Sequence, residues 1–200
     1  MNKNKCLYVR IAGSLLFFSV GIFGCMSPPL QVQYHRVHVS TLQSSTQEHA
    51  LDTILVGPIR VGSFLGQGPL VTQNSKHSVI LLEQHHWAGN LDEMLSQRIT
   101  QNLILELDHE KIYSYPESSG TKGIRLAMDF FHFEKDTMGN AFLEARWKII
   151  NNSDQSILFS STSSHTITPQ NSGYDALASG LSLALAELCR EIANQIIQVQ

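Results

Sequence analysis

Charged residues are scarce in this 200-residue sequence. Asp, Glu, Lys and Arg together make up 16% of it, below the roughly one quarter typical of globular proteins, whereas 42% of the residues are hydrophobic. That balance excludes a disordered polyelectrolyte and is enough for a packed core. The formal net charge of -3 leaves no excess of basic residues, so a nucleic-acid partner is not expected.

Cysteine and recognisable catalytic motifs are also sparse. Three cysteines are too few for a disulfide scaffold. The glycines at 57, 62, 66 and 68 do not occur in the strand–turn–helix order of a phosphate-binding or dinucleotide-binding loop. No G-x-S-x-G is present, so an esterase of the α/β-hydrolase type has no support.

The first residues are typical of an export signal. Lys3, Lys5 and Arg10 precede the uncharged apolar run IAGSLLFFSVGIF at 11–23. A positive start, an apolar stretch of about 7–15 residues and a small residue at the cleavage point describe a secretory signal. The run is shorter than the about 20 apolar residues of a spanning helix, although a single-pass anchor remains an alternative. We therefore expect residues 1–24 to be a signal peptide.

The end of this segment, Ile-Phe-Gly-Cys at 22–25, resembles the lipobox of bacterial lipoproteins. In that pattern an apolar residue three positions before the cysteine and a small residue just before it direct lipid attachment and cleavage. The resemblance implies that Cys25 becomes the lipidated first residue of the mature chain. Met26, in place of the aspartate that retains lipoproteins at the inner membrane, implies passage to the outer membrane.

Cleavage before Cys25 changes the charge and the cysteine inventory. Three cations leave with residues 1–24, so the formal charge moves from -3 to about -6. Cys6 leaves with the signal and Cys25 carries lipid, so Cys189 remains as the free thiol. Its apolar neighbours on a predicted helix indicate a buried, inert thiol, with an intermolecular disulfide as the alternative.

The mature chain is predicted to be a lipidated N-terminus and tether over 25–50 followed by one α+β domain over 51–200. Alternating apolar and polar residues predict strands, and apolar residues at three- and four-residue steps predict two amphipathic helices. We expect strands over 34–39, 52–61, 70–72, 79–83, 124–134, 141–150 and 157–166, and helices over 90–107 and 174–197. The last three strands are expected to form an antiparallel meander.

Strands separated from two amphipathic helices describe a two-layer α+β domain, a mainly antiparallel sheet with both helices packed on one face. Two details accompany this prediction. Pro58 cannot donate a ladder hydrogen bond, so it marks a sheet edge or a bulge in the strand over 52–61. Asn90 and Glu93 have the spacing of a capping box at the start of the first helix.

Three apolar side chains are candidate partner contacts. Phe64 and Leu65 lie in the glycine-rich segment GSFLGQGP, where exposed apolar residues would suit a protein or lipid contact and burial in the core is the alternative. Trp87 lies three residues before the expected helix start. It could fasten the helix to the sheet or belong to the same contact patch.

A metal site is the alternative chemistry that the nine histidines raise. Glu83 and His85 are two residues apart on an expected strand and therefore share a face, whereas His86 points to the other face. A metal-dependent periplasmic hydrolase would need a third ligand from a distant part of the chain. Isolated histidines at the end of a strand are the simpler interpretation.

Several short motifs of the mature chain resemble the ABC-type transport auxiliary lipoprotein family, the PqiC-like lipoproteins of MCE (mammalian cell entry) transport systems. The matching motifs are VGPIRV at 56–61, Phe64-Leu65, Pro69-Leu70-Val71, His85-His86-Trp87 leading to Leu91, Leu95 and Asn102-Leu103, then Phe133 and LEARW at 143–147. They occur in the family's order and cover most of the mature chain.

The resemblance implies a non-enzymatic protein that needs no cofactor. Such lipoproteins lie on the periplasmic face of the outer membrane, anchored through lipid. They accompany an ABC transporter and a tunnel-forming MCE-domain protein that move phospholipid between the two membranes. A homo-oligomer is compatible with a tunnel partner. An assembly factor for another outer-membrane machine, such as lipopolysaccharide insertion, remains the alternative function.

Overall fold

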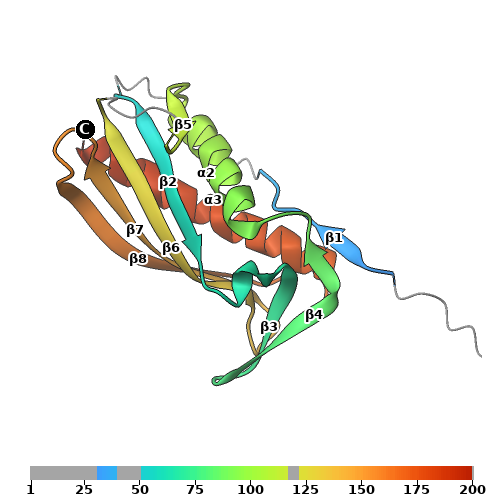
Figure 1. Ribbon diagram of the computed structural model, residues 1–200. Coiled ribbons are helices and arrows are strands. Elements are labelled where there is room, and N and C mark those ends of the chain that lie inside the picture. The colour runs from blue at the N-terminus through green and yellow to red at the C-terminus, as the bar shows by residue number, and fades with distance from the viewer. Residues whose placement is uncertain (1–30, 40–50, 117–121, 200) are drawn as a thin grey trace, which may run out of the picture. The chain divides into compact units, whose positions relative to one another are not determined.

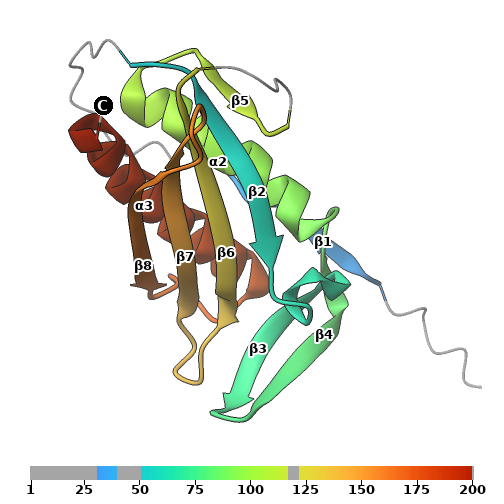
Figure 2. The same ribbon diagram turned by 60° about the vertical axis from the view of Figure 1, so that its left-hand side comes forward.

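The computed structural model describes residues 31–39, 51–116 and 122–199. These residues form an eight-stranded sheet and two long helices, α2 (Leu91–Leu107) and α3 (Tyr174–Val199). Figures 1 and 2 show both helices on the same side of the sheet. The predicted two-layer α+β fold is confirmed.

The strands follow the predicted order, with one addition. They are β1 (Gln33–His35), β2 (Ile54–Val61), β3 (Pro69–Ser75), β4 (Ser78–Trp87), β5 (Ile112–Ser114), β6 (Ile124–Lys135), β7 (Ala141–Asn151) and β8 (Ile157–Ile167), with a short 3-10 helix η1 (Leu65–Gln67) before β3. β6, β7 and β8 form the predicted antiparallel meander, and β3 and β4 form an antiparallel hairpin. The three-residue strand β5 was not expected from the sequence.

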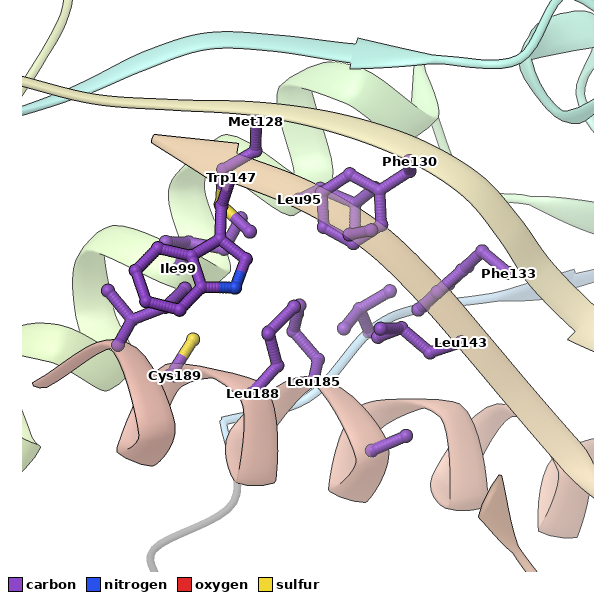
Figure 3. Packing of buried hydrophobic residues seen from close by; sticks show 14 of the residues in the cluster. Leu95, Ile99, Met128, Phe130, Phe133, Leu143, Trp147, Leu185, Leu188 and Cys189 are labelled. Atoms are coloured by element: carbon purple, nitrogen blue, oxygen red, sulfur yellow. The ribbon is translucent and has the colours of Figure 1, made fainter. Parts of the chain in front are cut away.

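Alternation along the meander divides its side chains between core and solvent. Leu126, Met128 and Phe130 of β6 are at most 1% exposed, whereas Asp129 between them is half-buried. Trp147 of β7 lies opposite Met128 and is also buried. Figure 3 shows Met128, Phe130 and Trp147 above α3, so the meander supplies one wall of the core.

The sheet is mixed, because parallel pairs join the antiparallel ones. β2 runs parallel to both β5 and β6, and β1 runs parallel to β4. The register between β2 and β6 shifts between Val56 and Ile59, on either side of Pro58. At Pro58 the structure therefore shows the bulge, and because the pairing of β2 with β5 ends at Val56, Pro58 also lies on an open edge of the strand.

Both helices bury the apolar stripe that their spacing predicts. Leu95, Ile99 and Leu103 of α2 are 0% exposed, as are Leu185 and Leu188 of α3. Asn90 precedes α2, and its amide donates to the Glu93 carboxylate at 3.4 Å rather than capping a backbone N–H. Among the residues that the structure describes, no helix is long and apolar enough to span a membrane.

Candidate functional site

The proposed lipid attachment point, Cys25, lies outside the described residues, and so does most of the expected tether. The first described strand, β1, belongs to the folded domain: it pairs with β4, and Val37 just after it is 0% exposed. The sequence predicted a short strand over 34–39; a strand is present, but β1 covers Gln33–His35 and does not extend to Val39. The folded domain therefore includes residues that were expected to lie in the tether.

Phe64 and Leu65 occupy different environments. Leu65 begins η1 and is 1% exposed, with its side chain in the main core. Its backbone N–H donates to the Gly62 carbonyl at 2.9 Å, which closes the turn that points the side chain inward. Phe64 is half-buried and packs against the same core. Of the two alternatives for this segment, burial describes Leu65, and only Phe64 keeps surface for a partner.

Trp87 is also a core residue, 4% exposed at the end of β4. Its ring centroid lies 5.6 Å from that of Phe133 on β6, and its backbone N–H donates to the Gly68 carbonyl at 2.8 Å. Direct partner contact through Leu65 or Trp87 would require their side chains to leave the core. Of the three predicted contact residues, only Phe64 has a side chain that a partner can reach without a change in the core.

The β3–β4 hairpin, called the arm below, borders a groove that the sequence did not indicate. The groove has a volume of about 570 Å³ and is lined by residues of the arm, the β6–β7 turn and the start of α3. Ile80 and Leu82 of β4, Met138 of the turn and Tyr174 of α3 line its apolar part. Ile80 is 47% exposed and Met138 is 85% exposed. The groove therefore offers exposed apolar contact area.

A buried carboxylate fastens the arm to the meander. Glu134 of β6 is 1% exposed and accepts a hydrogen bond from the Gln73 amide of β3 at 2.6 Å. His132 lies 2.8 Å from the same carboxylate oxygen and completes a three-residue cluster. A buried carboxylate is tolerated only with such partners, so we interpret the cluster as structural. No sequence signal pairs residue 73 with residue 134.

His85, a candidate ligand of the alternative metal site, is paired with another histidine instead. Its Nδ1 lies 3.1 Å from Nε2 of His35, and Nδ1 of His35 lies 3.0 Å from a carboxylate oxygen of Asp175. The Tyr174 ring covers His85, with centroids 4.0 Å apart. Glu83 is exposed. Within residues 31–39, 51–116 and 122–199, no group of three or more His, Cys, Asp or Glu side chains could hold a metal ion, so the hydrolase alternative gains no support.

Cys189 is buried on α3, as predicted, and burial raises the pKa of its thiol to about 12. The Asn102 amide lies 3.8 Å from the sulfur and opposes this shift, whereas Glu106 adds to it. The folded protein therefore keeps this thiol neutral in a pH range where an unfolded chain, with a thiol pKa of 9.0, ionises it.

We expect Cys189 to resist thiol reagents in the native protein. At about pH 8, alkylation by iodoacetamide should be at least about 100-fold slower than in denaturant, because the thiolate is the reactive form and the sulfur is shielded. Above about pH 9 the unfolded chain releases this proton and the folded chain does not, so the free energy of unfolding should fall as the pH rises. Equal alkylation rates with and without denaturant would contradict the burial of the thiol.

The fold and its surfaces define a two-layer α+β domain with a groove beside a projecting hairpin. The family model of the ABC-type transport auxiliary lipoprotein component matches residues 37–193, and the chain belongs to this family. The match spans nearly all of the described domain, which confirms the resemblance seen in the sequence motifs.

Solved structures share the fold at low sequence identity. Protein XCC0632 from Xanthomonas campestris, described by the family model DUF330, is 16% identical, with a TM-score of 0.73 over 84% of this chain and 96% of that chain. An uncharacterized protein is 18% identical, with a TM-score of 0.69 over 83% of this chain and 99% of that chain. No curated protein matches the sequence.

Proposed function

We propose that this protein is an outer-membrane lipoprotein, anchored through Cys25 on the periplasmic face, that serves an ABC transporter as a docking or assembly component. Its partner in this proposal is a tunnel-forming MCE-domain protein that carries phospholipid between the membranes. The proposed role requires no catalysis by this chain. Self-association into a homo-oligomer around the end of the tunnel is compatible with the same role.

The observation that carries the proposal is the family match over residues 37–193. Membership in a transport auxiliary lipoprotein family supports two parts of the proposal. These are that the protein associates with a transporter and that it is anchored through lipid. The lipobox-like Ile-Phe-Gly-Cys at 22–25 supports the attachment point. Phe64 supplies the proposed contact residue, because it alone of the three candidates keeps exposed area.

The direct test is recovery of partners from membranes. The tagged full chain is cross-linked in cells, extracted in detergent and analysed by mass spectrometry. We expect an MCE-domain protein together with the ATPase and permease of an ABC transporter. Phe64→Ala should reduce the recovered MCE-domain protein at least about fivefold, since loss of one buried aromatic contact costs on the order of 1–3 kcal/mol.

Phe131→Ala is the matched control, because Phe131 is 39% exposed and lies on β6 rather than in the η1 loop. This variant should recover as much MCE-domain protein as the unchanged chain. Recovery of lipopolysaccharide-insertion subunits in place of a transporter would overturn the proposed function in favour of the alternative. Equal recovery from the Phe64→Ala variant would overturn the contact residue alone.

A further inference from the structure

The connection between the domain and its proposed anchor runs through a short strand. Among the described residues, the three-residue β1 pairs with β4 through His85, His86 and Trp87. The His35 carbonyl also accepts a hydrogen bond from the Ala88 backbone N–H at 2.8 Å, and the Tyr34 ring lies against that of His86, with centroids 6.1 Å apart. After the strand, Val37 is buried and the His38 backbone N–H donates to the Ser182 hydroxyl at 3.0 Å. The side-chain contact between His35 and His85 adds to these interactions.

That contact accommodates one added proton but not two. The Nε2 of His35 and the Nδ1 of His85 face each other at 3.1 Å, so one nitrogen must donate and the other must accept. With both rings neutral, or with one proton added, this condition can be met. With both rings protonated, each nitrogen carries a hydrogen, and two positive charges meet at hydrogen-bond distance.

Charged groups face the pair from two neighbouring elements. From α3, the Asp175 carboxylate faces Nδ1 of His35 at 3.0 Å. Tyr174 of α3 covers the His85 ring, and Lys135 of β6 lies 5.6 Å from the centroid of Tyr174. When one ring of the pair carries a proton, a second proton must enter next to that charge.

The electrostatics of His85 agree with this geometry. Burial lowers the pKa of His85 below its ordinary value of 6.5, and the neighbouring His35 lowers it further, while Asp175 acts in the opposite direction. The folded state thus binds this proton less readily than the unfolded chain. The stabilising contribution of the contact is complete above about pH 6.5 and is lost as the pH falls below that value.

From this geometry we infer that His35 and His85 form an acid-sensitive latch on β1, closed at neutral pH and opened when both imidazoles are protonated. The consequence for the protein rests on the proposed lipid anchor: with lipid on Cys25, β1 is the first described element that follows the anchor, so its release would change how the domain is attached to the membrane.

The test is hydrogen–deuterium exchange of the full lipidated chain in detergent micelles at about pH 7.5 and about pH 5, corrected for the pH dependence of intrinsic exchange. We expect protection of peptides that cover β1 to fall at least about fivefold at the lower pH. Peptides from β6 and β7 should change less than about twofold, which separates release of β1 from global unfolding.

His85→Asn keeps a neutral amide donor near the position of Nδ1 and removes the second titratable group, so it should abolish most of the acid response. The matched control is His77→Asn. His77 is exposed in the turn between β3 and β4, outside the pairing of β1 with β4, so this variant should respond to acid as the unchanged chain does.

Imidazole NMR titration of the unchanged chain provides a second measurement should a variant not fold. It should show one histidine of the pair titrating below the ordinary range. Unchanged protection of β1 between the two pH values would overturn the latch, and so would an equal acid response in the His85→Asn variant. Neither measurement includes a transporter, so failure of the latch is distinguishable from failure of the proposed function.

Discussion

Leu65→Asp is expected to leave the domain largely unfolded at 25 °C. Leu65 is 1% exposed and belongs to the core formed by the sheet and both helices. Removing its side chain alone should cost about 2–5 kcal/mol, and burying a carboxylate without a partner adds several more. The sum is comparable with the entire stability of a domain of this size, about 5–15 kcal/mol. Loss of the near-ultraviolet circular dichroism signal and of a cooperative urea transition would show it.

The neighbouring residue provides the control. Phe64→Asp removes a half-buried side chain and can leave the new carboxylate in water, so we expect a loss of only about 1–2 kcal/mol and a cooperative urea transition. Equal destabilisation by the two substitutions would contradict the different burial of the two side chains. The contrast also decides which variant is useful in binding experiments, because an unfolded Leu65→Asp chain reports nothing about a contact surface.

The elements with a strong period were predictable from the sequence. β6 and β7 alternate buried and more open positions along most of their twelve and eleven residues, whereas β8 has one buried residue, Ser163. α3 repeats apolar residues at three- and four-residue steps over most of its length. In both cases one face is buried because apolar residues recur at the spacing of a strand or a helix. That spacing can be read directly from the sequence.

The parallel pairings were not predictable in the same way. β2 pairs with β6 across about seventy residues of chain, and β1 pairs with β4 across about fifty. β5 is three residues long, which is too short to show the alternation of apolar and polar residues that predicts a strand. These elements form because the larger elements leave an edge for them, and a single sequence does not show which edge that is.

The candidate contacts illustrate a related limit. A glycine-rich loop that contains apolar residues can project them into solvent or fold them inward, and composition does not distinguish these outcomes. Here the short η1 helix turns Leu65 inward, and the end of β4 does the same for Trp87. The pairing of His35 with His85 could not be predicted from the sequence either, because their contact depends on the parallel register of β1 against β4.

From the proposed lipid anchor at the outer membrane, we expect Cys25→Ser to remove the protein from that membrane. Two signals, such as dual acylation, give stable membrane residence because each buried methylene contributes about 0.8 kcal/mol, and a serine hydroxyl at this position cannot accept the thioether-linked lipid. Fractionation on a density gradient should find less than about one tenth of the usual amount in outer-membrane fractions. Mass spectrometry should show that the unchanged mature chain begins at residue 25 and carries acyl groups, and that the variant carries none.

Cys6→Ser is the matched control for the anchor, because Cys6 lies in the segment that is expected to be cleaved. This variant should be processed, acylated and located as the unchanged chain is. The Cys25→Ser chain can accumulate with its signal segment at the inner membrane or be released into the periplasm, and both places differ from the outer membrane. An outer-membrane share equal to that of the Cys6→Ser chain would show that something other than lipid on Cys25 holds the domain there.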